Sequence, residues 1–224
     1  MKLPKTIAID GPAASGKSTV AEKLAGSLGY LLFDTGVMYR AVTLAALETL
    51  HAVNNEQAVT SLAQHLQIDV QPPTKKDGRK YDVLLNGQDV TWQIRKSEVD
   101  ANVSHVSAYP GVRLAMTGQQ RRIGQRGEVV MVGRDIGTVV MPEAELKIYL
   151  DASVEERARR RFEEEQQRGE TQSYPEILAS MRRRDQIDST RAIAPLRPAS
   201  DAVIINSDGL DIEQVMQKVA ELLE

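Results

Sequence analysis

The residues from Gly11 to Ser18 combine the side-chain types and the spacing that hold a phosphate group. They read GPAASGKS and match the pattern G-x-x-x-x-G-K-[ST] without a mismatch. In loops of this kind the glycines let backbone N–H groups approach the phosphates, the lysine supplies positive charge to the β and γ oxygens, and the Ser or Thr hydroxyl reaches a Mg²⁺ ion. We therefore predict a nucleotide-phosphate site with Lys17 as its cation and Ser18 as its metal ligand. The alternative is a glycine-rich turn that binds nothing.

The segments on either side of this loop have the patterns that such a site requires. A phosphate-binding loop connects a buried strand to a helix, so that backbone N–H groups and the helix N-terminus point at one anion. Residues 6–9 (TIAI) predict the strand. Residues 18–28 predict the helix, because Val20, Leu24 and Leu28 recur at helical spacing on one face.

Length and composition restrict the class of protein. The chain has 224 residues, which favours a single α/β domain over residues 1–224, and no cysteine, which excludes disulfides and suits a reducing compartment. The N-terminal apolar run ends at Asp10, so neither a signal peptide nor a membrane span is expected. A net charge of −3 argues against a broad surface for a nucleic acid polymer. The 18 arginines against 10 lysines instead suggest a small, strongly anionic ligand, although a solvated helix face explains any single arginine as well.

Four further β-rich runs alternate with helical patterns, which predicts a five-stranded parallel sheet covered by helices on both faces. The strands are expected at 30–33, 128–132, 146–150 and 202–206. The helices are expected to begin near residues 18, 37, 54, 95, 111, 153, 173 and 212, and the helix from Val37 favours one apolar face. Because the carboxyl ends of parallel strands meet at one edge, we expect Lys17, Asp34 and Asp135 in one crevice. For Asp34, an N-cap of the following helix is the alternative.

Residues 67–93 interrupt this alternation. They alternate apolar and polar side chains and place Asn86-Gly87 between two apolar runs, which is the strongest short signal for a β-hairpin. We predict a small antiparallel β insertion. The run Thr74-Lys75-Lys76-Asp77 fits a guanine-recognition pattern, but it follows two prolines instead of a buried strand, so we interpret the match as chance.

Three further motifs, together with the phosphate loop, resemble one family. No D-x-x-G element, which a GTPase switch should carry, occurs in the chain. The segments Gly11–Thr19 (GPAASGKST), Asp34–Arg40 (DTGVMYR), Gly133–Val140 (GRDIGTVV) and Arg184–Leu196 (RDQIDSTRAIAPL) resemble bacterial cytidylate kinases, which are nucleoside monophosphate kinases with the P-loop kinase fold. The resemblance covers nearly the whole chain in order. Ala13-Ala14 departs from the family pattern, because it removes a side-chain hydroxyl at position 13.

The resemblance implies two nucleotide sites and one metal. ATP with Mg²⁺ would lie on Gly11, Pro12, Ala13, Ala14, Ser15, Gly16, Lys17, Ser18 and Thr19, with Arg157 and Arg161 of a lid at about 157–191. CMP would contact Asp34, Thr35, Tyr39, Arg40, Ser104, Arg113, Arg134, Asp135, Arg184, Asp188 and Arg191. The cytosine pocket would be Ser104, Arg113 and Asp135, and the 67–93 insertion would belong to this acceptor region.

The chemistry of these residues agrees with phosphoryl transfer. That reaction needs cations around the transferred group and little acid-base catalysis, so we predict catalytic roles for Lys17, Arg134, Arg184 and Arg191. For several of these residues, roles other than nucleotide binding stay open. Arg157 and Arg161 are four apart and fit a solvated helix face, Ser104 and Arg113 fit helix capping or coating, and Asp135 fits a metal-water ligand.

These observations lead to one predicted activity. The chain is expected to phosphorylate CMP and dCMP to CDP and dCDP with ATP, using UMP less well, as a cytoplasmic monomer. One alternative is another small-molecule P-loop kinase, acting on a different nucleotide or on shikimate. The other is a regulatory nucleotide-binding switch without an acceptor.

Overall fold

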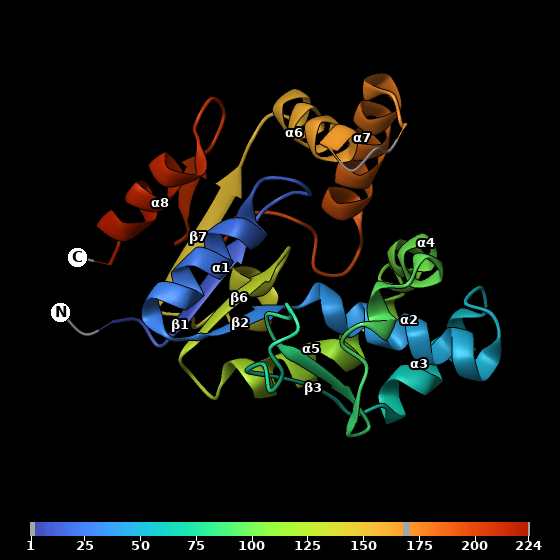
Figure 1. The fold of residues 1–224 in the computed structure, drawn as a ribbon. Helices are drawn as coiled ribbons and strands as arrows, with labels where there is room; N and C mark the ends of the chain where they lie inside the picture. Colours follow the sequence, from blue (N-terminus) through green and yellow to red (C-terminus); the bar gives the residue numbers. More distant parts are fainter. Residues whose placement is uncertain (1–2, 168–170, 224) are drawn as a thin grey trace.

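A five-stranded sheet forms the centre of the protein. In this computed structural model, which describes residues 3–167 and 171–223, the strands lie in the order β2-β6-β1-β7-β8, and every neighbouring pair is parallel (Figure 1). The strands are β1 (Thr6–Asp10), β2 (Leu31–Asp34), β6 (Val129–Gly133), β7 (Leu146–Asp151) and β8 (Val203–Asn206). This confirms the predicted sheet, with one or both boundaries of each strand shifted by one residue.

The strand order places a crevice at the end of β1. From β1 the chain crosses to β2 on one side, returns to β6, and then builds β7 and β8 on the other side. In open parallel sheets ligands bind where the winding direction changes, at the carboxyl ends of the strands. The phosphate loop, which follows β1, lies at that point.

Helices cover both faces of the sheet, as predicted. Alternate residues of β1 point to opposite faces, so Ile7 and Ile9 pack in one core and Ala8 in the other. The first core is closed by α1 (Lys17–Leu28) and α8 (Ile212–Glu221), and the second by α2 (Gly36–Leu50) and α5 (Pro110–Gly124). Within the described ranges, no helix is long and apolar enough to cross a membrane.

The helix α2 is more buried than its sequence pattern indicates. We expected one apolar face, but Val37–Tyr39 and Ala41–Ala46 are all buried. The reason is that α3 (Glu56–His65), α4 (Ser97–Val106), α5 and the short 3₁₀ turn Gln93–Arg95 all contact it. A helix that neighbours surround on most sides is apolar around most of its circumference.

The predicted insertion is a separate antiparallel sheet of β3 (Ile68–Gln71), β4 (Asp82–Leu85) and β5 (Gln88–Asp89). Asn86 and Gly87 have φ of 50° and 83°, the left-handed backbone of a tight hairpin turn. The side chains of the guanine-like run bind inside the insertion: Thr74 donates to Asp82, Lys75 pairs with Asp89, and Asp77 accepts from Arg79.

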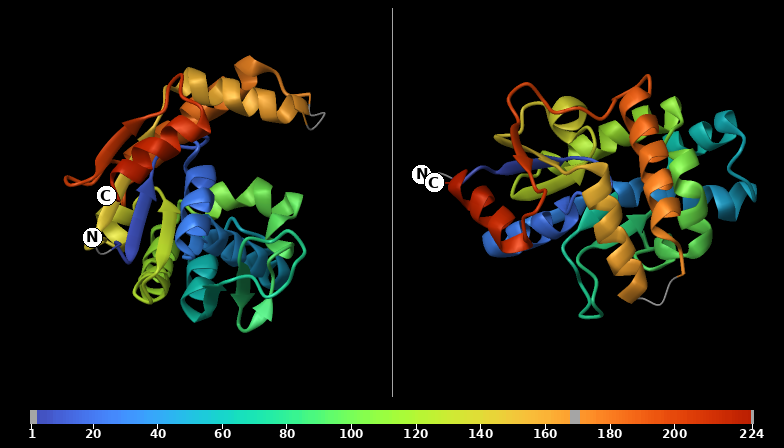
Figure 2. Two further views of the ribbon diagram at one scale, coloured as in Figure 1. Left: turned by 60° about the vertical axis from the view of Figure 1, so that its left-hand side comes forward. Right: turned by 90° about the horizontal axis from the view of Figure 1, so that it is seen from above.

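Two helices form a hairpin above the carboxyl edge of the sheet (Figures 1 and 2). They are α6 (Val154–Gln167) and α7 (Tyr174–Thr190), which pack through a small core of Ala158, Ile177 and Met181. Ser173 and Glu176 form the capping box that begins α7, which confirms Ser173 as its cap. Residues 168–170 of the predicted lid lie outside the described residues.

Candidate active site

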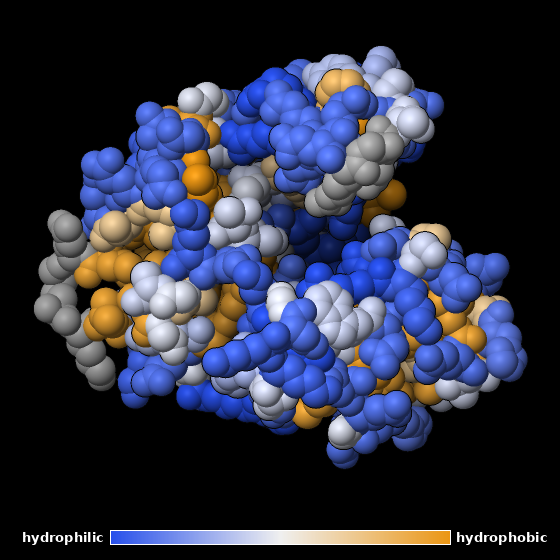
Figure 3. Space-filling view, in the orientation of Figure 1, coloured by the Kyte–Doolittle hydropathy of each residue, from blue (hydrophilic) through white to orange (hydrophobic). Residues whose placement is uncertain are grey.

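A cavity of about 530 Å³ opens at the carboxyl edge of the sheet. Figure 3 shows a hollow with hydrophilic walls between the α6–α7 hairpin and the body of the protein. Of the residues in 3–167 and 171–223, seven cationic side chains and four carboxylates line it, so this lining carries an excess of positive charge. They are Lys17, Arg40, Arg95, Arg113, Arg134, Arg184 and Arg191, with Asp34, Asp100, Asp135 and Asp188. We call it the first cavity; its charge suits an anionic ligand.

A second cavity of about 500 Å³ lies on the other side of the phosphate loop. It is walled by the loop, by α6 and by the start of α8, with apolar side chains such as Leu150, Leu210 and Ile212. Ala14, Lys17 and Ser18 line both cavities. A phosphate chain lying along the loop would therefore point from the second cavity into the first.

The loop depends on glycine at two positions. Gly11 has φ 153°, and a Cβ atom added there would lie 2.1 Å from the backbone oxygen of Leu150. Gly16 has φ 88°, in the left-handed region that L side chains rarely adopt. Both glycines let the loop turn directly above β1 and start α1 at Lys17.

Lys17 is buried, and its Nζ donates to the backbone oxygen of Pro12 at 2.6 Å. Burial, and secondarily the nearby Arg134 guanidinium, hold the pKa of the Lys17 ammonium well below its usual value. Neither a hydrogen bond nor an ion pair joins it to a carboxylate in the described part of the chain. Its charge is therefore under-compensated, which favours an anion beside it.

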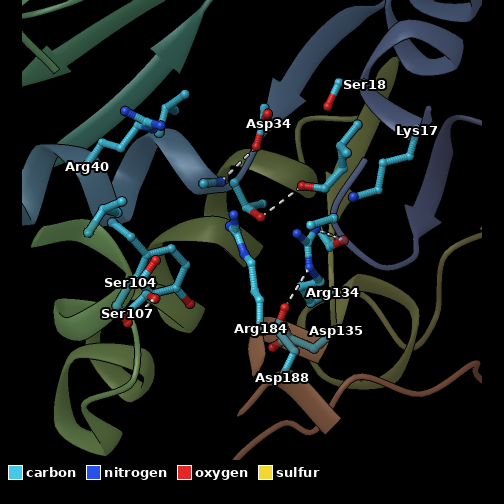
Figure 4. A pocket seen from close by; sticks show the side chains of 18 of the residues that line it. Lys17, Ser18, Asp34, Arg40, Ser104, Ser107, Arg134, Asp135, Arg184 and Asp188 are labelled. Carbon is cyan, nitrogen blue, oxygen red and sulfur yellow. Dashed lines mark hydrogen bonds and ion pairs between the residues drawn. The ribbon is translucent and has the colours of Figure 1, made fainter. Parts of the chain in front are cut away.

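All eleven residues predicted for the acceptor line the first cavity. Most of their arginines are paired with carboxylates. Both oxygens of Asp135 accept from Arg113, at 2.8 and 2.9 Å, and Asp135 also pairs with Arg191. Arg134 pairs with Asp188 (Figure 4) and Arg40 with Asp100.

Two groups of the lining have unused hydrogen-bonding capacity. The Nε atom of Arg113 is buried and has no hydrogen-bond partner among the described residues. Arg184 makes neither a hydrogen bond nor an ion pair within that same part of the chain.

Asp34 and Thr35 line the cavity, and their side chains also form hydrogen bonds with the backbone. Asp34 accepts from the backbone N–H of Gly36 at 2.9 Å and so supports the first turn of α2, but the N-cap is Thr35 and not Asp34 as the capping alternative had it. The Thr35 hydroxyl donates to the backbone oxygen of Val132, which joins the ends of β2 and β6.

Tyr39 is buried beneath Arg113, whose guanidinium carbon is 5.3 Å from the ring centroid.

Comparison with known proteins decides the family. A profile described as cytidylate kinase matches residues 7–224. The chain is 51% identical over 223 residues to a cytidylate kinase of Herpetosiphon aurantiacus, covering all of this chain and 96% of that protein. It is 54% identical over 210 residues to a cytidylate kinase of Chloroflexus aggregans, covering 94% and 90% of the two chains. The chain belongs to the cytidylate kinase family.

A solved structure shows the same fold at low sequence identity. An uncharacterized protein from Eubacterium ventriosum matches with a TM-score of 0.50 and 13% identity, over 97% of this chain and 96% of that one. At such identity the likeness concerns the fold alone.

The residues predicted to bind the phosphoryl donor ATP do not all line one cavity in this member of the cytidylate kinase family. Residues 14–19 and Arg161 line the second cavity and Ala13 lines the first, whereas Gly11 and Pro12 line neither. Arg157 also lines neither, because its guanidinium is buried against Ala13 and Asp185. Arg160, which the sequence did not single out, lines the second cavity with Arg161 and binds Ser207.

Asp10 is a second residue that sequence reasoning missed. It is 4% exposed and accepts from the backbone N–H groups of Ile136 and Gly137, at 2.8 and 2.7 Å. These groups begin the π-helical turn Ile136–Val140, directly after Arg134 and Asp135. Asp10 therefore ties the end of β1 to the loop that carries two site residues. The available signal was a carboxylate that ends a buried strand.

Burial, opposed by these two N–H groups, raises the pKa of Asp10 from 3.8 to about 6. Between those two values the folded state binds more protons than the unfolded state, so the free energy of unfolding should fall as pH rises from 4 to 6, by about 3 kcal/mol in all. Asp10→Asn should lack this fall. Urea unfolding of both proteins from pH 4 to 7 tests it, and parallel curves would contradict it.

Proposed function

We propose that the protein transfers the γ-phosphate of ATP to CMP and dCMP, giving CDP and dCDP, and that UMP is a poorer acceptor. The observation that carries the proposal is the loop shared by two cavities. With Lys17 and Ser18 lining both, a donor in the second cavity and an acceptor in the first would meet at the same cation.

The donor triphosphate would lie along residues 11–18, with the backbone N–H groups of the loop and the start of α1 directed at it. Mg²⁺ takes one or two protein oxygens and completes its shell with phosphates and water, and when bound it would neutralise phosphate charge. The oxygen donors present suit it, because the Ser18 hydroxyl and the Asp34 carboxylate both line the first cavity. Lys17 would hold the β and γ oxygens.

The acceptor phosphate would take the place of carboxylates around the arginines. Arg134 pairs with Asp188 and Arg191 with Asp135, and Arg184 is unpaired among the described residues. A phosphate bound between them would form charge-assisted hydrogen bonds and offset the charge that develops in transfer. It is already an anion at neutral pH, so no general base is needed.

The cytosine ring would lie at the far end of the first cavity. In Figure 4, Lys17 and Arg134 are at one end and Ser104 and Ser107 at the other. The Nε–H of Arg113 is buried and unused, so a turn of this side chain would bring a donor to the acceptor edge of the ring, and Asp135 would offer carboxylate oxygens to its amine. Uracil carries a carbonyl in place of that amine, so a carboxylate there would repel it.

We predict that Asp135→Ala lowers the ratio of kcat/KM for CMP over UMP by about tenfold or more, because the amine loses its acceptor. Ser104→Ala, which removes one rotatable hydroxyl, should lower it by a smaller factor. Steady-state kinetics with each nucleotide measure both ratios. Ratios equal to the wild-type value in both variants would place base selection elsewhere.

We further infer that residues 1–224 form one P-loop kinase domain acting as a cytoplasmic monomer, that residues 67–93 belong to the acceptor region, and that residues 157–191 close as a lid. An assay of ADP formation from ATP across a panel of nucleoside monophosphates, with shikimate included, tests the activity. CMP and dCMP should be the best acceptors. Turnover with another acceptor alone would favour a different small-molecule kinase, and nucleotide binding without any transfer would favour a switch.

A further inference from the structure

We propose that Arg157 is a positioning residue, which holds the α6–α7 hairpin against the phosphate loop so that α7 presents its side chains to the acceptor. The proposal rests on the function proposed above. It replaces the expected contact of this arginine with ATP.

The guanidinium of Arg157 joins three parts of the chain. Its Nε donates to the backbone oxygen of Ala152 at 2.9 Å, at the point where the chain leaves β7. Its Nη1 donates to the backbone oxygen of Ala13 in the phosphate loop at 3.1 Å. Nη1 and Nη2 also bind the two carboxylate oxygens of Asp185 on α7. The residue is 4% exposed, so these contacts are shielded from water.

Only arginine can make this set of contacts. Its planar guanidinium has five N–H donors in a fixed arrangement, so one side chain can bind two carbonyls and a carboxylate in different directions. A lysine is a point charge on a flexible chain and can occupy the space without holding all three partners.

The link ends on the part of α7 that faces the first cavity. Asp185 follows Arg184 and lies three residues before Asp188, and both of these line the cavity. At the other end, Ala13 also lines the first cavity and Ala14 lines both. Arg157 thus joins the loop that would bind the donor to the helix that would bind the acceptor.

The other polar contacts between α6 and α7 among the described residues are more exposed. Arg182 pairs with Glu155, but their side chains are 60% and 57% exposed, and such pairs contribute little. In contrast, the Arg157 and Asp185 side chains are 5% and 27% exposed. The apolar core of Ala158, Ile177 and Met181 holds the two helices together, and among the polar contacts we assign the orientation of α7 toward the loop to the Arg157–Asp185 pair.

Arg159 provides the matched control. It lies on the same helix, and its contacts are with Glu156 and Glu163, both within α6. A change of Arg159 to lysine alters an arginine of α6 without touching the loop or α7.

The test compares Arg157→Lys, Asp185→Asn, the double variant and Arg159→Lys in the full chain. A displacement of about 1 Å costs on the order of 10²-fold in rate, so kcat should fall by about ten- to a hundredfold in both single variants. The KM for ATP should change little. The double variant should be no slower than the slower of the two single variants, because both substitutions break the same contact between Arg157 and Asp185. Arg159→Lys should retain wild-type kinetics.

Three results would overturn the proposal. A higher KM for ATP with unchanged kcat would make Arg157 an ATP ligand. Losses that multiply in the double variant would mean that the two residues act separately. A lower melting temperature with unchanged kinetics would leave Arg157 a purely structural role.

Hydrogen exchange separates this proposal from the proposed function. If the wild-type protein phosphorylates no monophosphate, the function fails, but amide exchange in the ligand-free proteins still tests the link. The amides of residues 184–190 should exchange faster in Arg157→Lys than in the wild type, and at the wild-type rate in Arg159→Lys. Equal exchange in all three proteins would overturn the link.

Discussion

Replacing Lys17 with alanine should lower kcat by about 10³-fold or more, because it removes the one cation that lines both cavities among the residues that the structure describes. Loss of one preorganised group at a developing charge typically costs about 3 to 4 kcal/mol of transition-state stabilisation. The free energy of unfolding should change little. Since burial depresses the pKa of Lys17, the folded protein holds this charge at a cost, and alanine removes that cost along with some packing.

Lys23→Ala is the matched control for this prediction. Lys23 lies on the same helix, pairs with Glu213 and is 43% exposed, so its loss should alter neither kcat nor the melting temperature. Steady-state kinetics and thermal unfolding of both variants provide the measurement. Near-normal turnover in Lys17→Ala would refute the phosphate site.

Replacing Gly11 with alanine should lower the free energy of unfolding by about 4 kcal/mol or more, because the added methyl group would overlap the backbone of β7. The Cβ atom would lie 2.1 Å from the Leu150 oxygen and 3.1 Å from its carbon. Neither atom can rotate away, so either the loop or β7 must move. The variant should also lose activity, since the loop starts at this residue.

Gly26→Ala should have the opposite effect. Gly26 lies in α1 and is exposed, and a Cβ atom there would meet nothing within 4 Å. Alanine is favoured over glycine inside a helix by about 0.5 to 1 kcal/mol, so this variant should be slightly more stable than the wild type. Urea unfolding at one pH compares the two variants. Equal stability of Gly11→Ala and Gly26→Ala would contradict the close approach to Leu150.

Local sequence signals predicted most of the architecture. The strand-loop-helix around Gly11–Ser18, the Asn86-Gly87 hairpin and the Ser173 cap each depend on neighbours within a few residues, and the structure has all three. The carboxyl ends of the strands also placed Lys17, Asp34 and Asp135 correctly in one cavity, because a parallel sheet aligns those ends.

The features that were missed depend on distant partners. Asp10 binds backbone groups 126 and 127 residues away, and nothing in its own neighbourhood indicates them. For Arg157, helical spacing related it to Arg161 but did not indicate that its side of α6 is buried against the loop and Asp185. The burial of α2 on most sides likewise comes from segments packed around it.

The central claim is direct transfer between two nucleotides held on either side of one loop. It is tested by following ATP labelled in its γ-phosphate in the presence of CMP and Mg²⁺, and separating the products. We predict labelled CDP in a one-to-one ratio with ADP, and almost no labelled inorganic phosphate. Release of the label as inorganic phosphate at the same rate with and without CMP would contradict the account.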